Sequence, residues 1–196
     1  MEYTIITADN FKPASWSGGT TTQLFIFPPT ASYQQRNFQF RLSSATVDVE
    51  KSDFTSLPGF SRKLMILAGK ITISHQGHYS KQLNKFDVDT FEGDWNTSSV
   101  GKCTDFNLMT TDSTSGEIST CIIEKGRPLS IRIKESCDWY IIYLFAGIVG
   151  LKINDEIVSL SKGDLLVLNK PAAGSIKIDG VEDSELIVSE IYTVPQ

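Results

Sequence analysis

Hydrophobic and polar residues alternate along many short stretches of this chain, and this period of two limits its fold more than any other feature. The alternation is clear at residues 38–43, 71–74, 129–134 and 176–178. Such a pattern puts one set of side chains on each face of a β-strand, whereas no stretch sustains the 3.6-residue period of an amphipathic helix. The chain is therefore predicted to be all-β, with little helix beyond one turn near residues 54–58.

Turn-forming residues separate the predicted strands. Glycine-containing pairs occur at 18–19, 58–59, 76–77, 115–116, 173–174 and 179–180. Short alternating strands with such turns between them are typical of antiparallel sandwiches and barrels. The longest apolar run, residues 139–151, is shorter than the roughly 20 residues of a membrane-spanning helix. Its β-branched and aromatic content predicts buried strand instead, and no membrane partner is expected.

The two halves of the sequence resemble each other. Residues 65–73 and 143–151 each contain a strand-like run, an Ala-Gly pair and a second strand-like run. A Gly-Asp pair follows in each half, at 93–94 and 163–164. This order of elements resembles the cupin double-stranded β-helix, which is a jelly-roll barrel.

Two copies of that unit predict a bicupin. We expect a first barrel over residues 1–112, containing the candidate ligand pocket, and a second barrel over residues 117–196. The polar stretch at 113–116 is the predicted linker. Exchange of strands between the two barrels is compatible with the pattern.

Composition and charge restrict the partners and the compartment. The formal net charge is −5 and the basic residues form no stripe, so no nucleic-acid partner is expected. The first residues have neither the basic start nor the apolar run of a signal peptide. Cys103, Cys121 and Cys137 show no C-x-x-C spacing, which predicts reduced, partly buried thiols and a cytoplasmic protein.

Metal-ligating residues are scarce. His75 and His78 are the only histidines, and both lie in SHQGHYS, which has the composition of a hairpin tip. A site with three histidines, as in metal-dependent cupins, is impossible within one such chain, so both are predicted to be solvated turn residues and no metal or other cofactor is expected. Asp87 and Asp89 are likewise predicted to lie on a solvated strand edge. No nucleophile elbow or P-loop occurs.

Polar residues inside otherwise apolar strands leave two alternatives open. In FQFRLSSA, Arg41 and Ser43 share one face of the predicted strand. That face lies either toward solvent or toward the barrel lumen, where the Arg41 guanidinium could hold a carboxylate. The rarity of buried charges favours solvent. Asp105, Asn107 and Met109, which also share a face, present the same ambiguity.

Four ordered stretches show a more specific likeness. They are residues 16–22, residues 38–45, residues 54–62, and the pair 91–94 and 105–109. In these stretches the chain resembles the HutD/Ves family, which is associated with bacterial histidine utilisation and with stress-related proteins. The resemblance implies a bicupin fold, no known metal requirement and no established enzymatic reaction.

The resemblance also implies binding of small carboxylates from histidine breakdown, such as formylglutamate or urocanate, in order to limit or sense flux through that pathway. Carried onto the matching motifs, it makes ligand-binding candidates of Trp16, Thr20, Arg41, Arg62 and Asn107 and assigns no catalytic residue. The family often has Asn and Gly where this chain has Ser17 and Thr20. The loop here is therefore less flexible and differently polar.

The resulting hypothesis is a metal-independent protein that binds a small carboxylate, with Arg41 holding the acid and Trp16 covering it. One alternative is a metal-free cupin enzyme acting on a small acid or sugar, with Asp105 as base. Another is a protein-interaction module. Exposed barrel edges also allow a homodimer.

Overall fold

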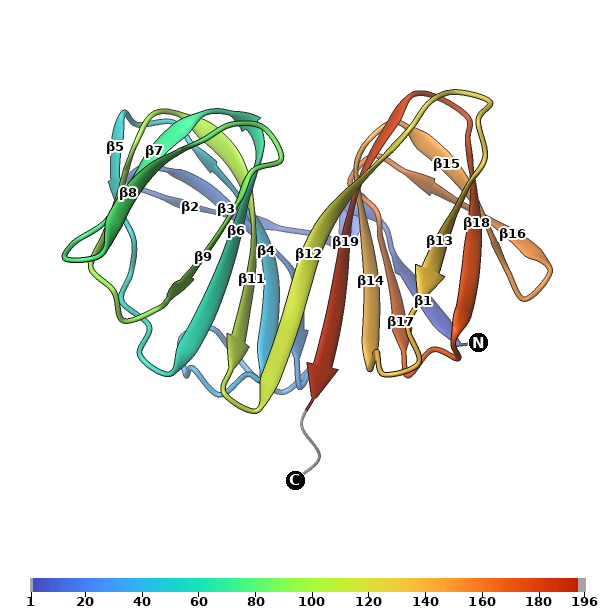
Figure 1. The fold of residues 1–196 in the computed structure, drawn as a ribbon, viewed down its shortest axis with the longest axis horizontal. Helices are drawn as coiled ribbons and strands as arrows, with labels where there is room; N and C mark the ends of the chain where they lie inside the picture. Colours follow the sequence, from blue (N-terminus) through green and yellow to red (C-terminus); the bar gives the residue numbers. More distant parts are fainter. Residues whose placement is uncertain (1, 194–196) are drawn as a thin grey trace. The chain divides into compact units, whose positions relative to one another are not determined.

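The computed structural model describes residues 2–193 of the chain. Two compact units divide it: one spans Phe11–Ser115, and the other contains the residues up to Asn10 and from Gly116 onward. Each unit consists of a larger and a smaller β-sheet, in which the paired strands are antiparallel (Figure 1). The prediction of an all-β fold with two jelly-roll barrels is confirmed.

In the unit Phe11–Ser115, the six-stranded sheet has the order β2-β3-β4-β11-β6-β9 and the four-stranded sheet has the order β5-β10-β7-β8. The strands are β2 (Pro13–Trp16), β3 (Gly19–Phe27), β4 (Phe40–Val47), β5 (Lys51–Asp53), β6 (Phe60–Gly69), β7 (Ile71–His75), β8 (Tyr79–Leu83), β9 (Val88–Glu92), β10 (Thr97–Val100) and β11 (Cys103–Thr111).

In the other unit, the five-stranded sheet has the order β1-β17-β14-β19-β12 and the four-stranded sheet has the order β13-β18-β15-β16. The strands are β1 (Tyr3–Ile6), β12 (Thr114–Ile123), β13 (Leu129–Ile133), β14 (Trp139–Ala146), β15 (Ile148–Ile153), β16 (Glu156–Ser161), β17 (Leu165–Asn169), β18 (Gly174–Gly180) and β19 (Ser184–Thr193). β1 pairs with β17, whereas the predicted first barrel includes residues 1–10.

In each copy of the internal repeat, the chain passes from the larger sheet of its unit to the smaller one. β6 and β14 belong to the larger sheets, and the strands that follow them, β7 and β15, belong to the smaller ones. Gly69 and Gly147 lie at these crossings with φ of 79° and 89°. A Cβ at Gly69 would overlap the Lys102 carbonyl oxygen, so both the backbone angle and the close approach require glycine.

The predicted helical turn at residues 54–58 is absent. The only helix in the described residues is a 3-10 turn at Ala8–Asn10. The Phe54 N–H donates to the Thr97 carbonyl and the Leu57 N–H donates to the Gly93 carbonyl. These backbone groups are therefore paired with distant segments, which leaves no local helical ladder.

The interiors of the two units differ. In the unit that contains β14, buried Ile, Leu, Val and Tyr side chains from both sheets form one apolar cluster. In the unit Phe11–Ser115, a smaller apolar cluster lies beside buried arginine, aspartate and asparagine side chains. The three cysteines are free and buried. No helix among residues 2–193 has the length and apolar character needed to cross a membrane.

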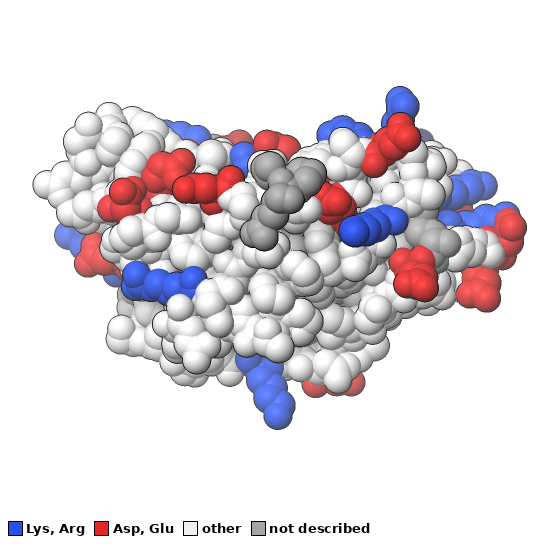
Figure 2. Space-filling view, turned by 90° about the horizontal axis from the view of Figure 1, so that it is seen from below, with Lys and Arg blue, Asp and Glu red and all other residues white. Residues whose placement is uncertain are grey.

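Charge on the surface is dispersed. On the face shown in Figure 2, the described Lys and Arg side chains are scattered among acidic and uncharged residues and form no continuous stripe. The formal net charge of the whole chain is −5.

Candidate functional site

A cavity of about 590 Å³ opens in the unit Phe11–Ser115, over the inner face of the larger sheet. Strands β3, β4, β11 and β6 provide its floor, and β2 with residues 31–34 and 52–55 provides the remaining walls. Four of the five predicted ligand-binding residues line it: Trp16, Arg41, Arg62 and Asn107.

The register of three neighbouring strands brings the polar residues together. Arg41 on β4 is paired with Met109 on β11, and Met109 is paired on its other side with Arg62 on β6. Two residues further along β4 and β11, Ser43 is paired with Asn107. Residues at positions i and i+2 share a face, so these side chains all point into the same cavity.

Arg41 lies inside the barrel, so the solvent-facing alternative is wrong. Arg41 is only 6% exposed to solvent. Nε donates to Gln23 Oε1 at 3.0 Å, Nη1 donates to Ser43 Oγ at 2.9 Å, and the Tyr33 ring centroid lies 4.6 Å from Cζ. These partners are neutral, and burial lowers the pKa of Arg41. Within the described residues, no carboxylate is ion-paired with this guanidinium.

Arg62 is buried beside two aromatic rings. Its Nη2 donates to Asn107 Oδ1 at 3.2 Å, and its Cζ lies 5.1 Å from the Phe54 ring centroid and 5.2 Å from that of Phe91. The buried Nε has no hydrogen-bond partner in the described part of the chain. Burial lowers the pKa of Arg62 to about 10, while nearby Asp105 acts in the opposite direction.

Asp105 is the buried carboxyl of this cavity. Its Oδ1 accepts a hydrogen bond from Asn107 Nδ2 at 2.6 Å, so the Asn107 amide links Asp105 to Arg62. Burial raises the pKa of Asp105 to about 7, and the Arg62 charge offsets only part of that rise. The carboxyl can therefore change its protonation state near neutral pH.

Trp16 lies at the edge of the cavity and is 40% exposed. A Cβ on Gly18 would overlap the indole ring, which shows that the ring rests on this glycine. Thr20 is not brought together with the other candidates. It is paired with Thr46, whereas Thr21 is paired with Ala45 and lines the cavity, so Thr20 points to the opposite face of β3.

The family model for HutD matches residues 8–187. The chain belongs to the HutD family. No curated protein sequence matches it.

Solved structures show the same fold at low sequence identity. A conserved protein of unknown function from Pseudomonas aeruginosa superposes with a TM-score of 0.83 at 19% identity, over 98% of this chain and 100% of that one. HutD from Pseudomonas fluorescens gives 0.75 at 19% identity, over 99% and 100% of the two chains. A bacterial pirin from Escherichia coli in complex with nickel(II) gives 0.71 at 11% identity, over 98% and 100%.

The cavity of this HutD-family chain does not fit a metal ion. Its buried polar side chains include two guanidinium groups, an amide, a hydroxyl and one carboxyl. A divalent cation would be repelled by both guanidinium groups and would find one anionic ligand, whereas metal sites in proteins usually offer three or four donors. Among residues 2–193, no group of three or more His, Cys, Asp or Glu side chains is arranged to hold a metal.

The prediction of solvated residues is wrong for His75 and Asp89. Imidazole Nε2 lies 2.8 Å from Asp89 Oδ2 and Nδ1 lies 2.8 Å from Thr97 Oγ1, while Lys81 Nζ approaches Asp89 Oδ1 to 2.6 Å. Both residues are at most 2% exposed. β7 continues through His75, whose position matches the inward-facing Ile73, and this continuation puts the imidazole inside the barrel.

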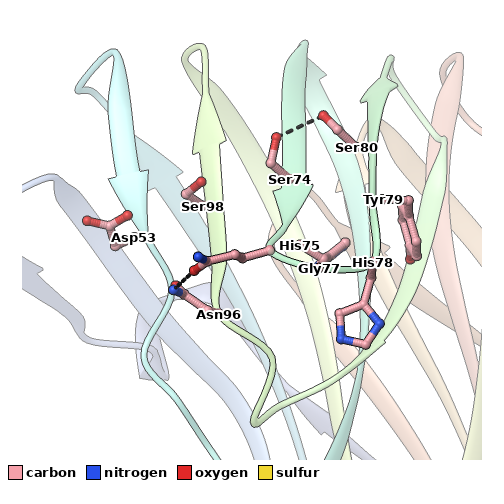
Figure 3. Close-up of a pocket in the computed structure, with 10 residues that line it drawn as sticks. Asp53, Ser74, His75, Gly77, His78, Tyr79, Ser80, Asn96 and Ser98 are labelled. Atoms are coloured by element: carbon pink, nitrogen blue, oxygen red, sulfur yellow. Dashed lines mark hydrogen bonds between the residues drawn. The ribbon is translucent and has the colours of Figure 1, made fainter.

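A second hollow of about 560 Å³ lies on the outer face of the smaller sheet of this unit (Figure 3). Ser74 and Ser80 are hydrogen-bonded across β7 and β8, and Asn96 is hydrogen-bonded to Gln76. The His78 ring is exposed and stacks on Trp95 at 3.7 Å between centroids. The side chain of His75 is fully buried, but the other residues that line this hollow are at least partly exposed. The hollow is therefore a weaker candidate for ligand binding than the cavity that contains Arg41.

Two contributors to the cavity were missing from the prediction. Gln23 lies on the same face of β3 as Thr21, but the run GTTTQ has no apolar residue to show which face is the inner one. Tyr33 comes from the turn region between β3 and β4, where no periodic pattern fixes the direction of a side chain. Its contact with Arg41 is a tertiary feature that the sequence does not signal.

Proposed function

We propose that this HutD-family chain binds a small carboxylate in the cavity of the unit Phe11–Ser115, without a metal ion. One observation supports this proposal most directly. Arg41 is buried and is held by Gln23, Ser43 and Tyr33, all neutral, so its charge lacks an anionic partner among the described residues. A buried cation without a counter-charge is unfavourable, and a ligand carboxylate would supply that charge.

The geometry suits recognition of a planar acid. Gln23 and Ser43 fix the guanidinium through Nε and Nη1, which leaves further N–H groups free to donate to a ligand. Charge-assisted hydrogen bonds of this kind are among the strongest in proteins. Trp16, at the cavity edge, would cover the ligand and exclude water from it.

The identity of the acid is a narrower proposal. The similar HutD structure from Pseudomonas fluorescens was obtained in a formate condition. A structurally similar oxalate decarboxylase from Lactobacillus farciminis is a formate complex. Formate is the smallest carboxylate. We take formylglutamate and urocanate as the first ligands to test, with sensing or limitation of histidine breakdown as the purpose of binding.

The test is a thermal-shift and calorimetric comparison of the parent protein with Arg41→Gln. A carboxylate at 100 times its dissociation constant adds about 2.7 kcal/mol to stability. We expect that gain in the parent and its loss in Arg41→Gln. Arg132→Gln, which changes an exposed arginine of β13 in the other unit, is the matched control and should behave as the parent. Equal carboxylate affinity in the parent and Arg41→Gln would refute the assignment.

A second candidate function is a metal-free enzyme with Asp105 as general base. The observation in its favour is the pKa of Asp105, raised by burial to about 7, since a base titrating near the working pH is an efficient catalyst. Proton NMR of each candidate acid with the protein should then show a product that is not formed by Asp105→Asn. If no new resonance appears during a long incubation, the binding role stands alone.

A further inference from the structure

We infer that the ligand of this cavity has two acidic groups and that Arg62 binds the second one. This inference rests on the proposed function, because it assigns another subsite of the same cavity. The observations that support it concern the hydrogen bonds and the charge of Arg62.

The guanidinium of Arg62 has an unused donor. Its hydrogen bond in the described residues is the one from Nη2 to Asn107 Oδ1, and its buried Nε has no partner. The rings of Phe54 and Phe91 stabilise the cation, but a ring face does not accept the in-plane N–H groups. Buried donors in proteins are nearly always hydrogen-bonded, so the unpaired Nε is a place where a ligand oxygen would be stabilised.

The charge in the cavity is also unbalanced. Arg41 and Arg62 are both buried in it, against the single buried carboxyl of Asp105. Asp105 accepts from the Asn107 amide and forms no direct ion pair with Arg62 among the described residues. Burial and the nearby Arg41 charge lower the pKa of Arg62, and Tyr33 and Asp105 offset this lowering only in part. When Asp105 is protonated, one carboxylate on Arg41 would leave the charge of Arg62 uncompensated, and a second acidic group would match it.

The spacing of the two arginines sets the kind of ligand. Their positions are separated by Met109 across three adjacent strands, so their Cα atoms are about 10 Å apart. Both side chains are long and line the same cavity. A short aliphatic diacid could therefore present one carboxylate to each guanidinium while its methylene groups lie near Met109.

The experiment is isothermal titration of the parent protein with succinate, glutarate and adipate, each compared with the monoacid of equal carbon number. We expect at least one diacid to bind about tenfold more tightly than its monoacid, the effect of one added charge-assisted contact. Arg62→Gln should remove that advantage and weaken monoacid binding less than diacid binding, since the monoacid makes its direct contact with Arg41 and loses only the longer-range attraction of Arg62. Arg41→Gln should weaken both classes.

Two further variants keep the result decisive. Lys12 is an exposed cation that also lines the cavity, and Lys12→Gln should retain the diacid preference. Arg62→Lys keeps the charge without the planar fork and serves if Arg62→Gln does not fold. Equal affinity of the parent for diacids and monoacids would overturn the second subsite and leave the proposed function intact, as would a preference lost in Lys12→Gln instead. Absence of binding by any acid would overturn both.

Discussion

Asp105 is buried, and its carboxyl changes from neutral to ionised near neutral pH. Folding raises the pKa of this carboxyl from its ordinary value of 3.8 to about 7, chiefly because burial disfavours the anion. The folded state therefore binds the proton more tightly than the unfolded state between these two values. The contribution of Asp105 to stability is fully present below pH 4 and is lost progressively as the pH rises from about 4 to about 7.

Asp105→Asn should consequently raise stability more at pH 8 than at pH 5, because the stability that the parent loses to ionisation grows between pH 4 and pH 7. Asparagine resembles the neutral carboxyl, and the pKa change corresponds to at most about 4 kcal/mol. Urea unfolding of the parent and the variant at the two pH values measures this difference. Asp179→Asn, an exposed position on β18, should show no such pH dependence. A gain of equal size at pH 5 and pH 8 would contradict the ionised state of Asp105.

Ligand binding should be linked to the same proton. An anion placed beside Asp105 raises the pKa of its carboxyl further, since like charges disfavour ionisation. Carboxylate affinity should therefore be higher at pH 6 than at pH 8, where Asp105 is ionised in the empty cavity. Titration in two buffers of different ionisation enthalpy would detect proton uptake on binding. A pH-independent affinity would show that Asp105 does not sense the ligand.

At the scale of elements, β4 and β11 show why the alternation of residues along a strand could not locate the site. Phe40 and Leu42 on one face of β4 are buried, yet Arg41 on the other face is buried as well. A strand that is covered on both faces gives the same alternation whichever face is the inner one. The sequence could predict which residues share a face, but the choice between solvent and lumen required the tertiary structure.

The sheet crossing at Gly69 provides a prediction at this scale. Gly69 and Gly59 have nearly equal φ angles, 79° and 81°, but a Cβ meets backbone atoms at Gly69 and nothing within 4 Å at Gly59. Gly59→Ala should cost about 1 kcal/mol, the price of the left-handed angle alone. Gly69→Ala should cost at least about 2 kcal/mol more, because the strands must move apart. Equal losses on urea unfolding would mean that the Lys102 carbonyl can shift freely.

At the scale of the whole molecule, two copies of one barrel plan have different interiors. The alternation and the Ala-Gly repeat were sufficient to predict the all-β fold, since both report on backbone geometry.

The candidate site was predicted only in part. Trp16, Arg41, Arg62 and Asn107 line the cavity, but Thr20 faces the other way, and the register that decides this depends on pairing with β4. His75 and Asp89 were misjudged because their mutual pairing, which permits burial, is not visible in sequence.

The pairing of β1 with β17 has a consequence for how the chain is made. On the ribosome, β1 is synthesised before the unit Phe11–Ser115, whereas its partner β17 is synthesised only after that unit has been translated. The strands of the cavity-bearing unit are all available before β17 exists. During translation the strands of that unit can therefore pair with one another while β1 still lacks its partner strand β17.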